Sequence, residues 1–172
     1  MKTLRSIILC ITTIISIQLT QAQAPITPDS TTILMSDNEL FDTIKEYDNA
    51  EYVKVTPFMI GMAKLMATGA EKEFLDKVKS MRIIALASCN PDDKAKYADL
   101  ISLVTLKKYE PVTEISDENI NMRIYLKMKE DIVTEMIIAQ WGTTQNYIMQ
   151  INGTLSIADI ESMSKGNNPN PM

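Results

Sequence analysis

The sequence predicts an α+β domain with a mainly antiparallel sheet, a C-terminal meander of strands, and helices packed on one face of the sheet. Three observations lead to this prediction. Residues that cap helices recur through the N-terminal half, at Ser36, Thr56 and Asn90. Between Tyr109 and Asn152 the pattern changes to β-branched and alternating segments separated by short polar stretches. The apolar share of 45% is enough to build a buried core.

The N-terminal segment is typical of a cleavable signal peptide. Lys2 and Arg5 precede an apolar stretch from Ile7 to Leu19, which is too short to hold a chain stably in a bilayer. Small residues follow this stretch, and cleavage is expected after Ala22. We therefore expect a periplasmic or secreted protein.

The mature chain divides into three parts. Residues 23–35 are rich in Pro, Thr and Ser without periodicity and are expected to form a disordered tether. A single α+β domain is expected over residues 36–164, followed by a flexible tail at 165–172. After signal cleavage, no apolar run approaches the roughly 20 residues that span a membrane.

Cap residues set the expected helices. Ser36 with Glu39 forms a capping box, and Thr56 and Asn90 are each followed by proline at the first helical position. The expected helices span residues 36–48, 57–68, 71–81 and 91–106. The segments between them predict a strand over residues 52–56 and a buried strand over residues 82–88.

The C-terminal half predicts a meander. A first strand over residues 109–115 contains Pro111, which suits an edge position because proline donates no hydrogen bond to a neighbour. The next strand alternates strictly between apolar and polar side chains over residues 122–129. Strands over 132–141 and 147–152 complete the antiparallel meander, and Ser156 with Asp159 begins a short closing helix.

Two segments resemble a known family. They are the Asp42-centred first helix leading into Tyr52-Val53-Lys54-Val55, and the stretch from Tyr147 to Ser156. The chain resembles the small exported Bacteroidota proteins of domain-of-unknown-function family 4252 over about residues 36–164. The resemblance implies export and this fold but no mechanism. Where the closing strand of that family runs apolar, this chain carries Gln150 and Asn152.

Composition excludes several classes of function. The signal peptide contains two of the 17 Lys and Arg and none of the 22 Asp and Glu, so the mature chain has a net charge of −7. Nucleic acid is then not an expected partner, because binding it depends on a basic face. The sequence has no histidine, which excludes imidazole catalysis and imidazole metal sites. With Cys10 removed, Cys89 has no partner for an intrachain disulfide.

Two faces of the predicted meander are candidate binding surfaces: the row of basic residues beside Tyr125, and the exposed side of the strand that carries Glu135 and Trp141. An antiparallel sheet can leave a face open, and Tyr, Trp and Arg are frequent at interfaces. The proposed surface residues are Arg123, Tyr125, Lys127, Lys129, Glu135 and Trp141. A solvated sheet face without a partner is the alternative.

Two sulfur-containing features have an alternative structural explanation. Met59, Met62 and Met66 lie at helical spacing and could suit copper(I), but a core stripe is favoured and no metal or cofactor is expected. Cys89 precedes a helix start and is a candidate reactive thiol, although Asp92 and Asp93 oppose a thiolate and a buried inert thiol is favoured.

Short motifs also suggest a modification. Asp29-Ser30-Thr31 and Asp42-Thr43-Ile44 resemble acidic-hydroxyl-apolar O-glycosylation sites, which makes Ser30 and Thr43 candidate acceptors. Matches of three residues also arise by chance.

The expected function is an exported, non-enzymatic binding or interaction module of the cell envelope. Its expected partner is a protein or another envelope component, with a homodimer paired along a sheet edge as one arrangement. The alternative is a small carboxylate-based hydrolase acting on envelope glycans, with Glu110 and Glu114 or Glu130 and Glu135 as its acid and base. Solvated surface carboxylates explain the same residues.

Overall fold

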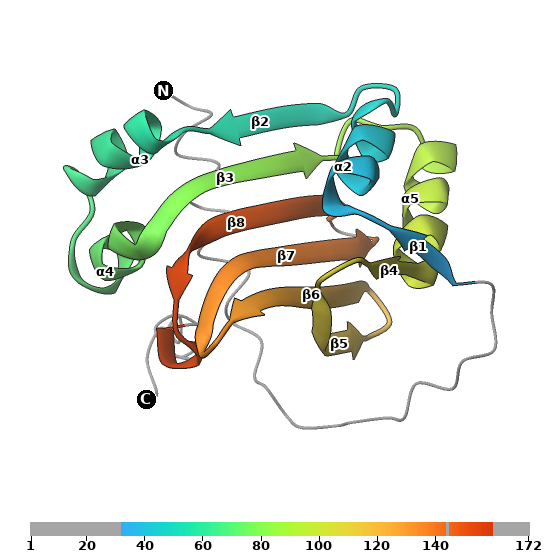
Figure 1. Cartoon of the computed structure of the whole chain (residues 1–172). Coiled ribbons are helices and arrows are strands. Elements are labelled where there is room, and N and C mark those ends of the chain that lie inside the picture. The colour runs from blue at the N-terminus through green and yellow to red at the C-terminus, as the bar shows by residue number, and fades with distance from the viewer. Residues whose placement is uncertain (1–31, 144, 160–172) are drawn as a thin grey trace, which may run out of the picture.

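The computed structural model describes residues 32–143 and 145–159, which contain four helices and eight strands (Figure 1). In chain order the elements are β1 (Ile33–Met35), α2 (Asp37–Lys45), β2 (Glu51–Val55), α3 (Pro57–Lys64), α4 (Gly69–Lys77), β3 (Val78–Ala85), α5 (Pro91–Leu103), β4 (Val104–Leu106), β5 (Glu110–Ser116), β6 (Ile120–Lys129), β7 (Ile132–Gly142) and β8 (Tyr147–Leu155). The predicted α+β class is confirmed.

Six strands form one antiparallel sheet in the order β2-β3-β8-β7-β6-β5. The predicted meander is confirmed, since β5 to β8 pair in succession. Strand β5 lies at the edge, where the missing N–H of Pro111 is tolerated. The last strand, β8, lies inside the sheet between β3 and β7. It therefore connects the β2–β3 pair with the meander (Figure 1).

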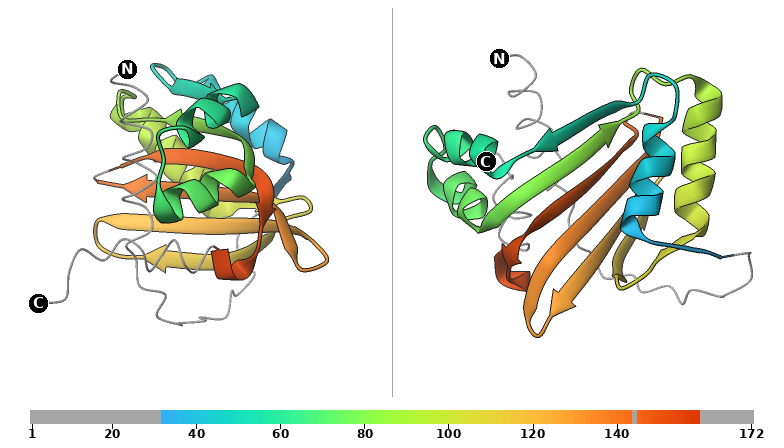
Figure 2. Two further views of the ribbon diagram at one scale, coloured as in Figure 1. Left: turned by 90° about the vertical axis from the view of Figure 1, so that its left-hand side faces the viewer. Right: turned by 45° about the horizontal axis from the view of Figure 1, so that its top comes forward.

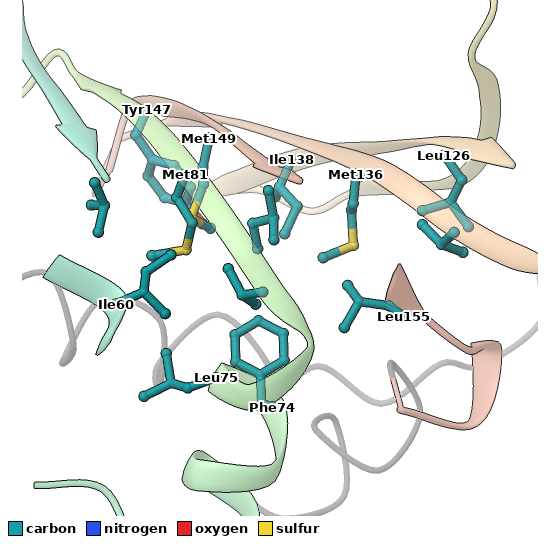
Figure 3. Packing of buried hydrophobic residues seen from close by; sticks show 14 of the residues in the cluster. Ile60, Phe74, Leu75, Met81, Leu126, Met136, Ile138, Tyr147, Met149 and Leu155 are labelled. Atoms are coloured by element: carbon teal, nitrogen blue, oxygen red, sulfur yellow. The ribbon is translucent and has the colours of Figure 1, made fainter. Parts of the chain in front are cut away.

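The sheet buries side chains on both faces, and the helices divide between them (Figure 2). Tyr125 of β6 points into a cluster with residues of α2 and α5, whereas its neighbour Leu126 points into a cluster with residues of α3 and α4. Figure 3 shows the second cluster, in which Ile60 and Phe74 approach the sheet from the helices. The expectation that the helices pack on one face is therefore corrected.

The predicted helix starts are confirmed at three caps. The Ser36 hydroxyl accepts from the Glu39 N–H, and the Glu39 carboxylate accepts from the Ser36 N–H at 2.7 Å. Thr56 caps α3 through the N–H of Met59, and Asn90 caps α5 through the N–H of Asp93 at 2.8 Å. These contacts depend on side chains only three residues apart, which is why the sequence could predict them.

Two short segments differ from the sequence expectation. Residues 33–35, expected in the tether, form β1, and residues 104–106, expected in a helix, form β4. These two strands pair in parallel, with Ile33 opposite Val104. Val104 and Leu106 of β4 are buried, and they belong to the hydrophobic cluster that contains residues of α2 and α5. Strand β3 also begins earlier than predicted, because α4 ends at Lys77.

The remaining predictions at the termini lie mostly outside the described residues. These are the signal peptide at 1–22, the first part of the tether, the closing helix beyond Asp159 and the tail at 165–172. The Ser156–Asp159 capping box is present, with the Ser156 N–H donating to the Asp159 carboxylate at 2.8 Å. None of the described helices is both long and apolar enough to cross a bilayer.

Candidate functional site

Helix α3 carries apolar side chains on two opposite sides. Ile60 is 2% exposed and packs into the core with half-buried Met59 and Ala63. Four further apolar residues on the helix or directly after it face outward: Phe58, Met62, Leu65 and Met66, exposed by 77%, 51%, 79% and 83%. We call these four residues the α3 patch.

The α3 patch corrects the prediction of a core stripe. Of the three methionines at helical spacing, only Met59 packs against the core, whereas Met62 and Met66 are exposed. A helix that is apolar all round is normally buried on all sides. A cluster of large apolar side chains left in solvent marks an interaction surface more often than it serves stability.

A second feature is a row of hydrogen-bonded polar side chains across the sheet, on the face covered by α2. Gln150 of β8 is 3% exposed and lies at its centre. Its amide nitrogen lies 2.8 Å from the Tyr109 hydroxyl, 2.9 Å from Glu135 and 3.1 Å from Asp37. Its amide oxygen accepts from Arg82. We call the set the polar row: Asp37, Arg82, Tyr109, Lys127, Glu135 and Gln150.

The two ends of the polar row are ion pairs. Arg82 contacts Asp37 at 2.8 Å and lies 4.0 Å from the centroid of the Phe41 ring, while Lys127 pairs with Glu135. Burial opposes ionisation of Glu135, but hydrogen bonds from Lys127 and Tyr109 outweigh it and lower the pKa of Glu135. Burial and the bond to Glu135 raise the pKa of Tyr109. Opposite charges therefore alternate along the row. Because Asp37 is the first residue of α2, its contacts with Arg82 and Gln150 hold the start of this helix on the sheet.

The polar face of β6 serves as an attachment for α5. Arg123 donates to the carbonyl oxygens of Ile101 and Ser102, at 2.8 and 3.3 Å, in the last turn of α5. That turn has no basic residue of its own, so a guanidinium from the sheet satisfies its carbonyl groups. The Tyr125 hydroxyl lies 3.2 Å from the carbonyl oxygen of Val104 in the same way.

The six residues of the predicted binding surface therefore do not form one open face. Tyr125 is 2% exposed, and Arg123 is held by α5 and by Glu114 at 2.7 Å. Lys127 and Glu135 pair with each other in the polar row. Trp141 packs against the buried cluster that α2 and α5 form with the sheet. Lys129 is exposed near the end of the strand. As positioned, Tyr125 cannot touch a partner, because the helix layer covers it.

Cys89 lies at the end of the loop before α5 and is 5% exposed. Burial, followed by the charge of Asp93, raises the pKa of the Cys89 thiol. Both effects disfavour the thiolate, in agreement with a buried structural thiol rather than a reactive one.

The candidate glycosylation sites differ in what the structure shows. Thr43 lies on the exposed side of α2 with its hydroxyl donating to the Glu39 carbonyl oxygen at 2.8 Å, whereas Ser30 lies outside the described residues. Among the described residues, no group of three or more His, Cys, Asp or Glu is arranged to hold a metal ion.

Sequence comparison gives one family. The model of a domain of unknown function, DUF4252, matches residues 42–163, which is most of the described fold. The chain belongs to the DUF4252 family. No curated protein and no solved structure matches this DUF4252 protein. The family description names no activity, so inferences about function depend on the geometry above.

Sequence reasoning missed four members of the polar row: Asp37, Arg82, Tyr109 and Gln150. Only Gln150 left a signal, as a polar residue in an otherwise apolar closing strand. A buried amide needs partners, and its partners come from positions 15 to 113 residues away. Met62 and Met66 of the α3 patch were visible in the methionine stripe, but periodicity alone does not tell which side of a helix remains uncovered.

Proposed function

We propose that this DUF4252 protein is an exported, non-enzymatic interaction module of the cell envelope that binds a protein or another envelope component. The observation that supports this most is the α3 patch, since Leu65 and Met66 project into solvent without a role in the core. Export is supported by the basic, apolar and small-residue order of the first 22 residues.

A carboxylate hydrolase acting on envelope glycans is the second candidate. One pair of carboxylates that the structure brings together is Asp37 and Glu135, which both accept from the amide nitrogen of Gln150. A general acid needs a raised pKa, whereas the pKa of Glu135 is lowered and Lys127 neutralises its charge. This chemistry favours a structural role for the pair. Absence of hydrolysis in a screen of envelope glycans at high protein concentration would remove this candidate.

Site-specific photocrosslinking in the envelope tests the proposed function and locates the interface. A benzophenone amino acid is placed at Met66 in the α3 patch, at Lys129 on the sheet and at Glu118 in an exposed loop as the matched control. We expect adducts from position 66 and none from position 118. Adducts from position 129 alone would move the interface to the sheet face, and their absence at both 66 and 129 would overturn the proposal.

A further inference from the structure

We propose that the α3 patch docks on the surface of an anionic lipid bilayer. This inference rests on the proposed function and names the class of partner. The partner is a flat, negatively charged surface with an apolar interior, which would receive Phe58, Met62, Leu65 and Met66 and be flanked by lysine side chains.

The size of the α3 patch favours a bilayer over a second protein. A stable protein interface buries roughly 800 Å² on each partner. At about 200 Å² for each fully exposed side chain, the exposed fractions of these four residues give roughly 600 Å² in all, which is less than that area. Insertion into the headgroup region requires no matching partner surface, so a few protruding apolar side chains are sufficient.

The position of α3 allows approach to a plane. In Figure 2 (right), α3 and α4 lie together at one end of the sheet, and α2 and α5 lie at the other. The α3 patch is therefore at an end of the folded domain. Leu65 and Met66, at the end of α3, are among its most exposed side chains.

Charge in this part of the chain is opposite to that of the whole. Residues 54–79 contain five lysines and three acidic residues, whereas the full sequence has 17 basic and 22 acidic residues. The five lysines are Lys54, Lys64, Lys72, Lys77 and Lys79. Basic residues beside an apolar helical face are typical of segments that lie in the interface of an anionic membrane.

Two carboxylates pair with these lysines, Asp76 and, from outside the segment, Asp159 with Lys77, whereas Glu71 and Glu73 are exposed. Asp76 on α4 pairs with Lys64 at 3.5 Å and with Lys72 at 2.9 Å, so one carboxylate is shared between two cations. Lysine stems can lie along apolar surface while the ammonium group reaches a lipid headgroup. With Asp159 counted beside Glu71, Glu73 and Asp76, five lysines stand against four carboxylates. A net charge of +1 therefore remains around α3 and α4, the sign that complements an anionic surface.

Vesicle flotation tests the inference with the chain from which the signal peptide has been removed. Vesicles of phosphatidylcholine alone are compared with mixtures of phosphatidylcholine and phosphatidylglycerol. We expect binding to the anionic mixture, weaker binding at raised salt, and little binding to phosphatidylcholine alone.

Matched variants assign the binding to the α3 patch. The pair Leu65→Ser and Met66→Ser is expected to reduce affinity for anionic vesicles at least tenfold, whereas Val112→Ser with Ile132→Ser, at exposed apolar sites elsewhere, leaves it unchanged. Lys72→Gln is expected to reduce it by about fivefold at low salt. Circular dichroism and urea midpoints equal to wild type show that the variants are folded.

The outcomes separate this inference from the proposed function. Failure to bind anionic vesicles, or undiminished binding by the Leu65 and Met66 variant, would overturn docking on lipid. Crosslinks from position 66 to an envelope protein together with no vesicle binding would overturn the lipid inference but leave the interaction module standing. A concentration-dependent dimer that is lost in the variant would assign the α3 patch to a second copy and would also overturn it.

Discussion

Replacing Gln150 with leucine would remove the amide that joins the two ends of the polar row. Leucine has a similar volume, so the change deletes polar contacts without opening a large cavity. The amide serves Asp37, Tyr109 and Glu135 as a donor and Arg82 as an acceptor. The side chain is 3% exposed, so water cannot readily replace it.

The expected loss of stability depends on whether each partner of Gln150 keeps another hydrogen bond or ion pair. Asp37 still pairs with Arg82, and Glu135 keeps both Lys127 and Tyr109. The Arg82 Nε–H loses its acceptor, the Gln150 amide oxygen, and a hydrogen bond involving a charged group contributes about 1.5–3 kcal/mol. Weaker contacts at Asp37 and Glu135 add to this, so we expect a decrease of about 2–4 kcal/mol in the free energy of unfolding.

Urea denaturation provides the measurement, with fluorescence of Trp141, the single tryptophan, as the probe. Gln145→Leu is the matched control, because it makes the same substitution at an exposed position and is expected to change stability by no more than about 0.5 kcal/mol. If Gln150→Leu is no less stable than Gln145→Leu, then the polar row does not stabilise the fold and the reasoning is wrong.

Three further outcomes follow from the contacts described above. Arg123→Met should lower the free energy of unfolding by about 1–3 kcal/mol, because the last turn of α5 loses its donor; an unchanged urea midpoint would contradict this capping. The hydrogen bond from Lys77 and those from Ser156 lower the pKa of Asp159 from 3.8 to about 2, so its stabilising contribution is present above 3.8 and is lost as pH falls toward 2. Asp159→Asn should flatten the dependence of the urea midpoint on pH in that window, and an identical slope would argue against this. Cys89 should react slowly with a maleimide in the native state and rapidly in urea; equal rates would show that it is accessible.

Sequence predicted best what adjacent residues decide. The caps at Ser36, Thr56 and Asn90 and the edge position of Pro111 depend on neighbours within a few residues, and each is confirmed. The β1–β4 pair escaped prediction because three-residue strands have no periodicity, and their pairing joins segments far apart in the chain.

The surface was harder to predict than the framework. The alternation in β6 identified its two faces correctly, but charge suggested that the Arg123 face meets solvent. In the fold, Arg123 donates to α5 carbonyl groups and Lys127 pairs with Glu135, partners that sequence order does not reveal. Conversely, Met62 and Met66 were expected in a core stripe and are exposed, because nothing among the described residues covers the outer side of α3.

The central place of β8 also bears on how the chain reaches its folded state. This strand forms hydrogen bonds with both β3 and β7, yet it is the last of the described strands to be synthesised. Until residue 155 is available, β2 and β3 remain separate from the meander, and the sheet cannot close. Such late, long-range pairing slows folding relative to translation. We propose that this chain crosses a membrane unfolded. A fold that the N-terminal part cannot complete without β8 helps to keep the chain unfolded until it is exported.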